Sequence, residues 1–272
     1  MFDKVLIANR GEIAVRINRA CQELGISTVA IHSEADADSM HVRIADESVC
    51  IGPNPVNKSY LNAHAIISAC EITGAQAVHP GYVFLSENAS FAKMLDDHKL
   101  TFIGPKHKHI SMMGDKIEAK KIMQEYGVPT VPGSKGAVAD LKDALKTSTD
   151  IGFPVLLKAS AGGGGRGMKV VNDEKELTDA LPIIKQEALS FFGNDSIYIE
   201  KFIDSPRHIE IQVICDSHNN FLHLHERDCS IQRRNQKVIE EALAPEIDQT
   251  KKEKLFKICI DAMAKMGYLG LG

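Results

Sequence analysis

The chain contains no tryptophan, and aromatic residues make up only 6% of its 272 residues. No stretch approaches the ~20 consecutive apolar residues that a membrane-spanning helix needs, so no membrane partner is expected. Neither half carries a dominant basic run, and the net charge of −4 gives no sign of a nucleic-acid surface. These absences leave soluble proteins and small molecules as the expected partners.

The six cysteines are scattered and never form a C-x-x-C pair. Such spacing suggests neither a zinc site nor a disulfide framework, and it fits a reduced, cytoplasmic compartment. The N-terminus shows neither the apolar core of a signal peptide nor an Arg/Ser-rich transit segment. With 44% hydrophobic and 25% charged residues, the composition is that of a globular protein large enough for two domains.

Residues 1–105 alternate between buried strand patterns and amphipathic helix patterns. We expect strands at 5–8, 27–31, 46–51, 76–78 and 101–104, with helices at 12–24, 62–73 and 86–97. A strand-helix-strand opening predicts a parallel sheet with right-handed crossovers. Residues 79–82 (HPGY) follow the fourth strand, where such sheets bind ligands, although an ordinary Pro-Gly turn explains them equally well.

Four consecutive glycines at 162–165 interrupt the second half of the chain. An apolar run at 153–157 leads into Lys158, and after Gly167 the chain continues as a β-branched segment at 168–171. Glycine runs are most often flexible linkers, but Lys158 at the strand end favours a phosphate-facing loop. The dinucleotide-binding fingerprint needs a helix after its glycines, whereas a strand is expected here. A Walker A loop needs Lys-Ser or Lys-Thr after its last glycine, and Met168 and Lys169 stand there instead. We therefore expect a strand-loop-strand lid over a nucleotide.

The remaining segments predict a mixture of helices and antiparallel strands. Helices are expected at 116–126, 138–149, 173–191 and 248–266, and an antiparallel meander at 196–203, 207–214 and 221–227. His208, Glu210 and Gln212 share one face of the middle strand, which is either a solvated face or the wall of a ligand groove. Residues 228–241 concentrate charges of both signs, a pattern that is usually solvated surface.

Seven sequence blocks occur in a characteristic order: IANRGEIAVRI at 7–17, HPGYVFLSEN at 79–88, FIGP at 102–105, MGDK at 113–116, KASAGGGGRGM at 158–168, EKFIDSPRHIEIQV at 200–213 and ERDCSIQRRNQKVIEEA at 226–242. In this order they resemble the biotin carboxylase family, the ATP-grasp component of acetyl-CoA, propionyl-CoA and pyruvate carboxylases. The resemblance implies an α/β fold with a parallel-sheet, Rossmann-like domain at 1–112. An incomplete ATP-grasp domain would follow at 113–272, with an antiparallel sheet and a glycine-rich lid at 130–203.

The same resemblance assigns roles to individual residues. Those implied to bind the nucleotide are Lys116, Lys158, Gly163, Gly164, Gly165, Gly167, Glu200, Lys201, Phe202, Ile203, His208, Gln232 and Asn235. Lys237 is implied as the catalytic residue that binds bicarbonate, and Tyr82 as a residue near the biotin ring. No metal ligand is assigned within the chain, since the family's acidic Mg²⁺ ligands are expected in a further C-terminal segment.

The function implied by the resemblance is ATP-dependent carboxylation of carrier-bound biotin with bicarbonate, via carboxyphosphate. It would serve a biotin-dependent carboxylase such as the acetyl-CoA carboxylase of fatty acid biosynthesis. The implied partners are the biotin carboxyl carrier protein, a carboxyltransferase and a second copy of the chain. Alternatives are another ATP-grasp ligase, such as a carbamoyl-phosphate-type synthetase, or a truncated nucleotide-binding fragment without catalysis. Without the further segment, the chain alone is expected to be inactive.

Three residues depart from the family pattern. Asn235 stands where histidine is frequent, Val83 where glycine is usual, and Leu243 where a proline is expected. A β-branched residue at a position that favours glycine is expected to strain the HPGY turn.

Overall fold

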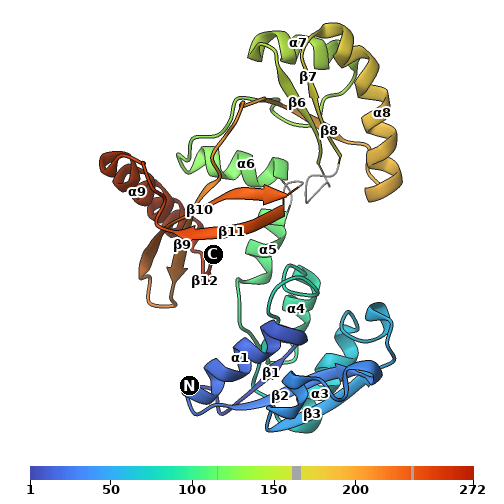
Figure 1. Ribbon diagram of the computed structural model, residues 1–272, viewed down its shortest axis with the longest axis vertical. Helices are drawn as coiled ribbons and strands as arrows, with labels where there is room; N and C mark the ends of the chain where they lie inside the picture. The colour runs from blue at the N-terminus through green and yellow to red at the C-terminus, as the bar shows by residue number, and fades with distance from the viewer. Residues whose placement is uncertain (115, 161–166, 234–235) are drawn as a thin grey trace. The chain divides into compact units, whose positions relative to one another are not determined.

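The computed structural model describes residues 1–114, 116–160, 167–233 and 236–272, and at residues 116 and 117 it describes the backbone alone. Figure 1 colours the chain from blue at the N-terminus to red at the C-terminus. The chain divides into two compact units. The first comprises Met1–Ser111 and Tyr268–Leu271, and the second comprises Met112–Gly267 and Gly272. No helix in the described part of the chain is long and apolar enough to span a membrane.

The first unit is built on a five-stranded parallel sheet with the order β3-β2-β1-β4-β5. Its strands are β1 (Lys4–Ile7), β2 (Ser27–Ser33), β3 (Glu47–Gly52), β4 (Ala77–His79) and β5 (Thr101–Phe102). The predicted parallel sheet is confirmed. Because the strand order reverses between β1 and β4, the loops that follow these two strands flank the position where open α/β sheets bind ligands.

Helices cover both faces of this sheet. They are α1 (Gly11–Glu23), α2 (Met40–Arg43), α3 (Ala63–Thr73) and α4 (Ala89–Asp97), with the 3-10 turns η1 (Glu34–Asp36) and η2 (Val56–Lys58). Alternate residues of β1 point to opposite faces: Val5 and Ile7 pack with α1, whereas Leu6 packs with α3 and α4. Two separate apolar cores therefore hold the unit together.

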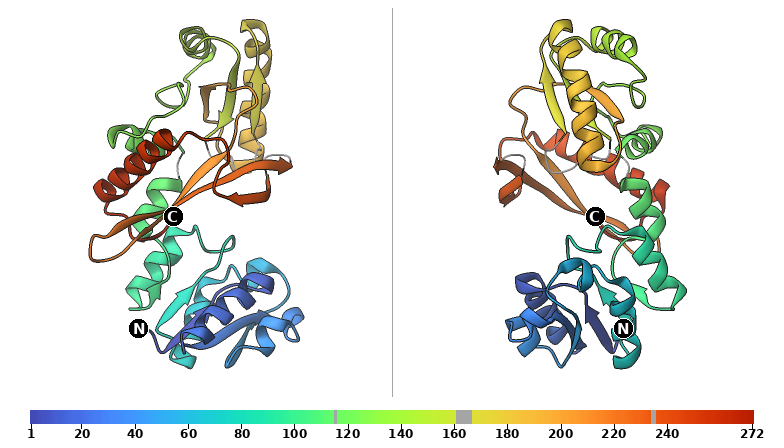
Figure 2. Two further views of the ribbon diagram at one scale, coloured as in Figure 1. Left: turned by 60° about the vertical axis from the view of Figure 1, so that its left-hand side comes forward. Right: turned by 90° about the vertical axis from the view of Figure 1, so that its right-hand side faces the viewer.

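The second unit begins within α5 (His107–Gly114) and continues through α6 (Lys116–Glu125) to a three-stranded antiparallel sheet. This sheet has the order β7-β6-β8 and consists of β6 (Val155–Ala159), β7 (Met168–Val171) and β8 (Ile197–Lys201). Helices α7 (Leu141–Ile151) and α8 (Glu174–Phe192) pack side by side on one face, as Figure 1 and Figure 2 show. The expected strand-loop-strand arrangement on either side of the glycines is confirmed.

Side-chain alternation gives this sheet one apolar and one polar face. Leu157, Ile197 and Ile199 are fully buried in the core with α7 and α8. Lys158 and Glu200 are offset by one residue from these positions and therefore point to the opposite face. The polar face is where the candidate nucleotide-binding residues gather.

A second antiparallel sheet follows, in which β11 (Gln236–Ala242), β10 (Phe221–Arg233) and β9 (Ile209–Cys215) lie in that order. Helix α9 (Gln249–Met266) packs against β9 and β10, and the ring of Phe256 stacks on His223 at 4.0 Å between centroids. Asp248 caps α9 by accepting a hydrogen bond from the Lys251 N–H, as its position predicts. The short strand β12 (Gly270–Leu271) closes the chain.

The predicted meander at 196–227 is wrong in one respect. Strand β8 pairs with β6 in the three-stranded sheet, so only β9 and β10 of the three predicted strands are neighbours. The segment 228–241, for which the charge pattern predicts solvated surface, forms the end of β10 and most of β11, and the β11 part is solvent-exposed as predicted. Every residue of β11 is exposed, so this strand lacks the apolar alternation that marks a strand in the sequence.

Candidate nucleotide and bicarbonate site

A cavity of about 520 Å³ lies on the polar face of the three-stranded sheet. It is lined by Val131, Leu156, Lys158, Met168, Val170, Glu200, Lys201, Phe202, Ile203 and Pro206. Five of these are residues that the sequence predicts to bind nucleotide, and they come from β6, β8 and the segment after β8. The apolar residues form walls suited to a planar ring, while Lys158 and Glu200 supply charge.

Glu200 lies between two ammonium groups. Its Oε2 is 2.6 Å from Lys158 Nζ and its Oε1 is 3.1 Å from Lys120 Nζ. Burial raises the pKa of Glu200, but the hydrogen bonds and charges of the two lysines outweigh it, so the pKa lies below the ordinary value. The carboxylate is therefore ionised, and the three groups together carry one net positive charge.

Sequence reasoning missed Lys120. Its partner Glu200 is 80 residues away along the chain, so no local pattern identifies the pair. One signal was available: Lys120 follows Lys116 by four residues on α6, a spacing that places both on one helix face. Gly133 permits the approach, since a Cβ there would lie 2.9 Å from Lys120 Nζ and 2.5 Å from the Ile199 carbonyl oxygen.

Lys201 does not direct its ammonium into the cavity. Its Nζ donates to the carbonyl oxygens of Gly152 at 2.9 Å and Phe153 at 3.1 Å. Its backbone N–H donates to the Pro132 carbonyl oxygen at 2.8 Å. Lys201 therefore fixes the segment after β8 against the loop before β6. Ile203, with 49% of its surface exposed, offers an apolar contact beyond it.

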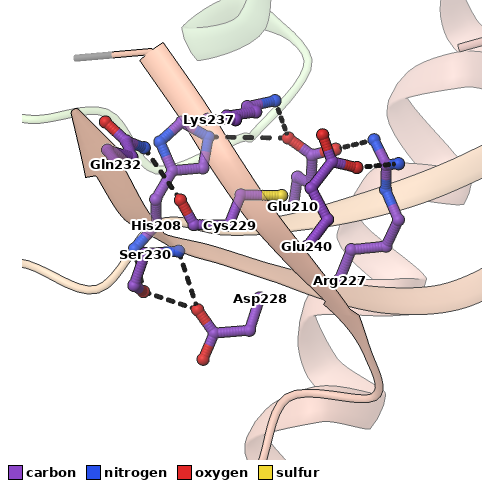
Figure 3. A network of polar contacts seen from close by, with 9 residues as sticks. All are labelled: His208, Glu210, Arg227, Asp228, Cys229, Ser230, Gln232, Lys237 and Glu240. Atoms are coloured by element: carbon purple, nitrogen blue, oxygen red, sulfur yellow. Dashed lines mark hydrogen bonds and ion pairs between the residues drawn. The ribbon is translucent and has the colours of Figure 1, made fainter. Parts of the chain in front are cut away.

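A second polar network spans β9, β10 and β11 and is drawn in Figure 3. At its centre Glu210 accepts hydrogen bonds from Arg227 and Lys237, and His208 Nε2 lies 3.5 Å from Glu210 Oε2. Arg227 also bridges to Glu240 at 2.5 Å. Burial raises the pKa of Glu210, but Lys237 and Arg227 outweigh it and lower the pKa below its ordinary value.

The pairing of β10 with β11 is irregular around Ile231, where the register shifts on either side. Such bulges re-aim side chains, and here Gln232 Nε2 donates to the Cys229 carbonyl oxygen at 2.9 Å. Asp228 accepts from Arg207 at 2.7 Å and from both the N–H and hydroxyl of Ser230, which lowers its pKa to about 2. These contacts fix the strand end that carries Gln232.

The structure thus brings together two groups of predicted residues. Lys158, Glu200, Lys201, Phe202 and Ile203 share one cavity, and His208 and Lys237 meet on Glu210. The side chain of Lys116 and the positions Gly163, Gly164, Gly165 and Asn235 lie outside the described residues. Tyr82 belongs to the first unit, in the HPGY turn.

Comparison with known proteins gives two matches that together cover both units. A family model described as the N-terminal domain of biotin carboxylase matches residues 1–110. A second, described as the ATP-binding domain of the carbamoyl-phosphate synthase L chain, matches residues 115–272. The biotin carboxylase of Pseudomonas aeruginosa is 55% identical over the whole chain, which covers 61% of that relative. The chain belongs to the biotin carboxylase family.

Other relatives agree with this membership. The mitochondrial propionyl-CoA carboxylase alpha chain of Rattus norvegicus is 58% identical over 89% of this chain and 33% of its own length. Among solved structures, a biotin carboxylase–β,γ-ATP complex from Campylobacter jejuni has a TM-score of 0.95 and 48% identity, covering all of this chain and 61% of that one. The fold is that of biotin carboxylase. The chain spans about 61% of the length of the bacterial biotin carboxylases it matches.

The HPGY turn of this family member is held by a buried side chain. The Asn9 amide, 4% exposed, donates to the carbonyl oxygens of Pro80 and Tyr82, both at 2.8 Å, and its oxygen accepts from the Arg10 N–H. The Tyr82 hydroxyl donates to Glu12. This hydrogen bond is the main reason why the pKa of Tyr82 is raised. Asn9 therefore fixes the turn from the end of β1.

Val83, the departure from the family glycine, occupies left-handed backbone with φ +62°, and Phe84 follows at φ +34°. Both values are rare for residues with a side chain, so the predicted strain is confirmed. The turn persists because Phe84 stacks on Tyr60 at 5.3 Å and the Arg10 guanidinium lies 5.8 Å from the Phe84 ring centre.

Two further family positions can be judged from backbone geometry. Gly167, at the end of the glycine loop, has φ +67° and its carbonyl accepts from the Ala159 N–H at 2.8 Å; a Cβ there would lie 2.9 Å from the Ala159 Cβ. Leu243 has φ +68°, which proline cannot adopt because its ring fixes φ near −65°. The backbone at Leu243 therefore differs from one that carries a proline.

Within the described residues, one group has metal-ligand spacing: Glu210, Cys229 and Glu240 have ligand atoms within 4.8 Å of one another. The group does not fit Mg²⁺, which prefers oxygen ligands in octahedral geometry. One ligand is a buried thiol, and both carboxylates already bind Arg227. No step of the reaction is assigned to a metal at this position.

Proposed function

We propose that this chain supplies the nucleotide- and bicarbonate-binding part of a biotin carboxylase. The reaction is the ATP-dependent carboxylation of carrier-bound biotin with bicarbonate, via carboxyphosphate. The observation that carries the proposal is the ionised Glu200 between Lys158 and Lys120 at the edge of an apolar cavity. An apolar slot beside excess positive charge matches a purine attached to phosphates.

The adenine would lie between the apolar walls of the cavity, against Phe202 and Ile203. Lys158 would contact the phosphates, since an ammonium has three donors and Glu200 takes only one. Lys116, Gly163, Gly164, Gly165 and Gly167 would complete the phosphate contacts, with His208, Gln232 and Asn235 on the opposite side of the nucleotide. Neutralising the γ-phosphoryl oxygens is the main task of such a site, because little covalent chemistry falls to the protein.

Lys237 would bind bicarbonate. Glu210 accepts a hydrogen bond from one N–H of the Lys237 ammonium, and the other N–H groups remain available for a small anion. Lys237 and Arg227 hold the pKa of Glu210 below its ordinary value, so the ionised carboxylate orients the ammonium of Lys237. A fixed ammonium positions bicarbonate for attack on the γ-phosphorus of ATP, which makes a bimolecular step effectively intramolecular. Tyr82 would lie near the biotin ring.

The partners and substrates follow from the relatives. A structure of the biotin carboxylase domain of the Hydrogenobacter thermophilus 2-oxoglutarate carboxylase, 48% identical to this chain, is a dimer with MgADP, ADP and bicarbonate. We propose the same ligands for this protein, together with a homodimer, a biotin carboxyl carrier protein and a carboxyltransferase in the cytoplasm. The acyl-CoA or keto acid that is finally carboxylated is chosen by the carboxyltransferase; acetyl-CoA, for fatty acid biosynthesis, is the proposed case.

A second candidate is a carbamoyl-phosphate-type ATP-grasp ligase. It is favoured by the family model that matches residues 115–272. Such an enzyme would share Lys158 and the glycine loop, but biotin would not stimulate its ATP hydrolysis.

A chimera tests the proposed function. This chain would replace the aligned 61% of the Pseudomonas aeruginosa biotin carboxylase, and ADP release would be measured with and without biotin and bicarbonate. We expect ADP release that depends on both, and a fall of roughly a hundredfold with Lys237→Gln, the range of a single electrostatic catalytic group. The matched control, Lys142→Gln on α7, should retain full activity. A folded chimera whose ATP hydrolysis ignores biotin would contradict the proposal.

A further inference from the structure

A second cavity lies beside Lys120, the ion-pair partner of Glu200. It has a volume of about 280 Å³ and is lined by Lys120, Lys121, Gln124, Gly133, Ser134, Lys135 and Tyr198. These residues come from α6, from the loop that follows it and from β8, all within the second unit. Lys120 lines this cavity and Glu200 lines the candidate nucleotide cavity, so the ion pair between them connects the two.

The loop that forms one wall is fixed to β8. Ser134 donates its backbone N–H to the Ile199 carbonyl oxygen at 2.8 Å, and its hydroxyl accepts from the Ile199 N–H at 3.1 Å. The same hydroxyl donates to the Gly136 carbonyl oxygen at 2.7 Å. The wall that carries Lys135 is therefore preformed.

The charge of this cavity is strongly positive. Lys120 is held at 17% side-chain exposure by Glu200, and that carboxylate is shared with Lys158. Lys121 and Lys135 are exposed, and neither has an ion-pair partner among the residues that the structure describes. Three lysines thus line this cavity, and among the ion pairs of the described residues only Lys120 has a carboxylate partner, which it shares with Lys158.

We propose that this cavity binds a phosphate group, as inorganic phosphate or as a small phosphomonoester. Ammonium groups bind phosphate as point charges, and a dianion matches the surplus of positive charge. The volume of about 280 Å³ lies just below the range for ligand pockets, about 300–1,000 Å³, which favours a ligand little larger than the phosphate itself. Phosphate would contact Lys121 and Lys135 at the mouth and Lys120 at the inner end.

Occupancy of this site affects Lys158, a consequence that rests on the proposed nucleotide site. An anion on Lys120 competes with Glu200 for the charge of that ammonium, and the carboxylate then pairs more strongly with Lys158. Lys158 is held more firmly and becomes less available to a nucleotide phosphate. Phosphate and nucleotide therefore oppose each other, and linkage requires each to weaken the other by the same factor, about fivefold or more.

Calorimetric titration of the chain with inorganic phosphate, and with glycerol phosphate as the phosphomonoester, tests the proposal. The test variant is Lys121→Gln/Lys135→Gln, and the matched control is Lys142→Gln/Lys146→Gln, two exposed lysines of α7 with the same loss of charge. We expect binding to weaken about tenfold or more in the test variant and to stay unchanged in the control. Equal affinity in the test variant, or no binding to the wild-type chain, would overturn the site.

Lys158→Gln separates this site from the nucleotide site. Phosphate binding that persists in Lys158→Gln supports the second cavity. Binding that is lost in Lys158→Gln but kept in Lys121→Gln/Lys135→Gln places phosphate in the nucleotide cavity, which overturns the inference and leaves the proposed function intact. In the wild-type chain under saturating ADP, we expect phosphate to bind still, but more weakly; complete exclusion of phosphate by ADP would indicate a single shared site and would also overturn the inference.

Discussion

Lys158 Nζ and Glu200 Oε2 lie 2.6 Å apart on neighbouring strands of one sheet, with side-chain exposures of 24% and 14%. The pair lies on the sheet face opposite the apolar core, and Lys120 completes it from α6. This arrangement gives the cavity beside β6 and β8 a fixed, ionised centre around which the proposed nucleotide contacts are organised.

Glu200→Gln should destabilise the second unit. The substitution leaves Lys158 and Lys120 close together without a counter-charge, and breaking a buried pair costs about 3–5 kcal/mol. Because the three groups are only partly buried, we expect about 1–2 kcal/mol. Urea unfolding should be compared with Glu187→Gln, an exposed glutamate of α8. A loss of stability no greater than in that control would contradict the assigned role.

Protonation of Asp228 should contribute to acid unfolding. Its folded-state pKa, lowered to about 2 by Arg207 and Ser230, lies below the unfolded value of roughly 3.9. A depressed pKa means that the stabilisation is fully present above the unfolded value and is lost as pH falls toward the folded value. The window is therefore about pH 4 to pH 2. Asp228→Asn should show a flatter stability profile there; an unchanged slope would count against the interaction.

Val83→Gly should stabilise the first unit. Left-handed backbone costs a non-glycine residue about 1–2 kcal/mol, and the greater freedom of glycine in the unfolded chain offsets about 0.5–1 kcal/mol. Val83 is 70% exposed, so little apolar burial is lost. We expect a net gain of about 0.5–1 kcal/mol in chemical unfolding. The control is Val15→Gly within α1, which should destabilise. Destabilisation by Val83→Gly would show that the turn is not strained.

Much of the fold follows from local pattern, because β1, β2 and β4 are apolar runs and α1 and α9 carry helical periodicity with end signals. The pairing of β8 with β6 was missed because a strand pattern does not identify its partner. The strand β11 was missed because an exposed strand at a sheet edge has no apolar face to reveal it. Similarly, Lys120 looks like any surface lysine until Glu200 is brought beside it by the tertiary fold.

Likewise, some features of the candidate site could be predicted from the sequence and others could not. Glu200, Lys201 and Ile203 were found through a resemblance of sequence blocks, whereas the ionised state of Glu200 follows only from its two lysine partners. The network of Glu210 with Arg227 and Lys237 joins three strands, and the pairing of β10 is irregular with both of its neighbours, β9 and β11. Such geometry depends on irregular pairing that no periodic pattern describes.

The most direct test of the central claim is the affinity of this chain for ATP, measured by calorimetry and by the shift in unfolding temperature. The account predicts saturable binding that stabilises the chain, and a loss of about tenfold or more in Lys158→Gln, since a charge-assisted hydrogen bond contributes about 1.5–3 kcal/mol. Lys142→Gln on α7 should bind as the wild-type chain does. Absence of ATP binding by the folded chain, or equal affinity in Lys158→Gln, would contradict the claim that this cavity is a nucleotide site.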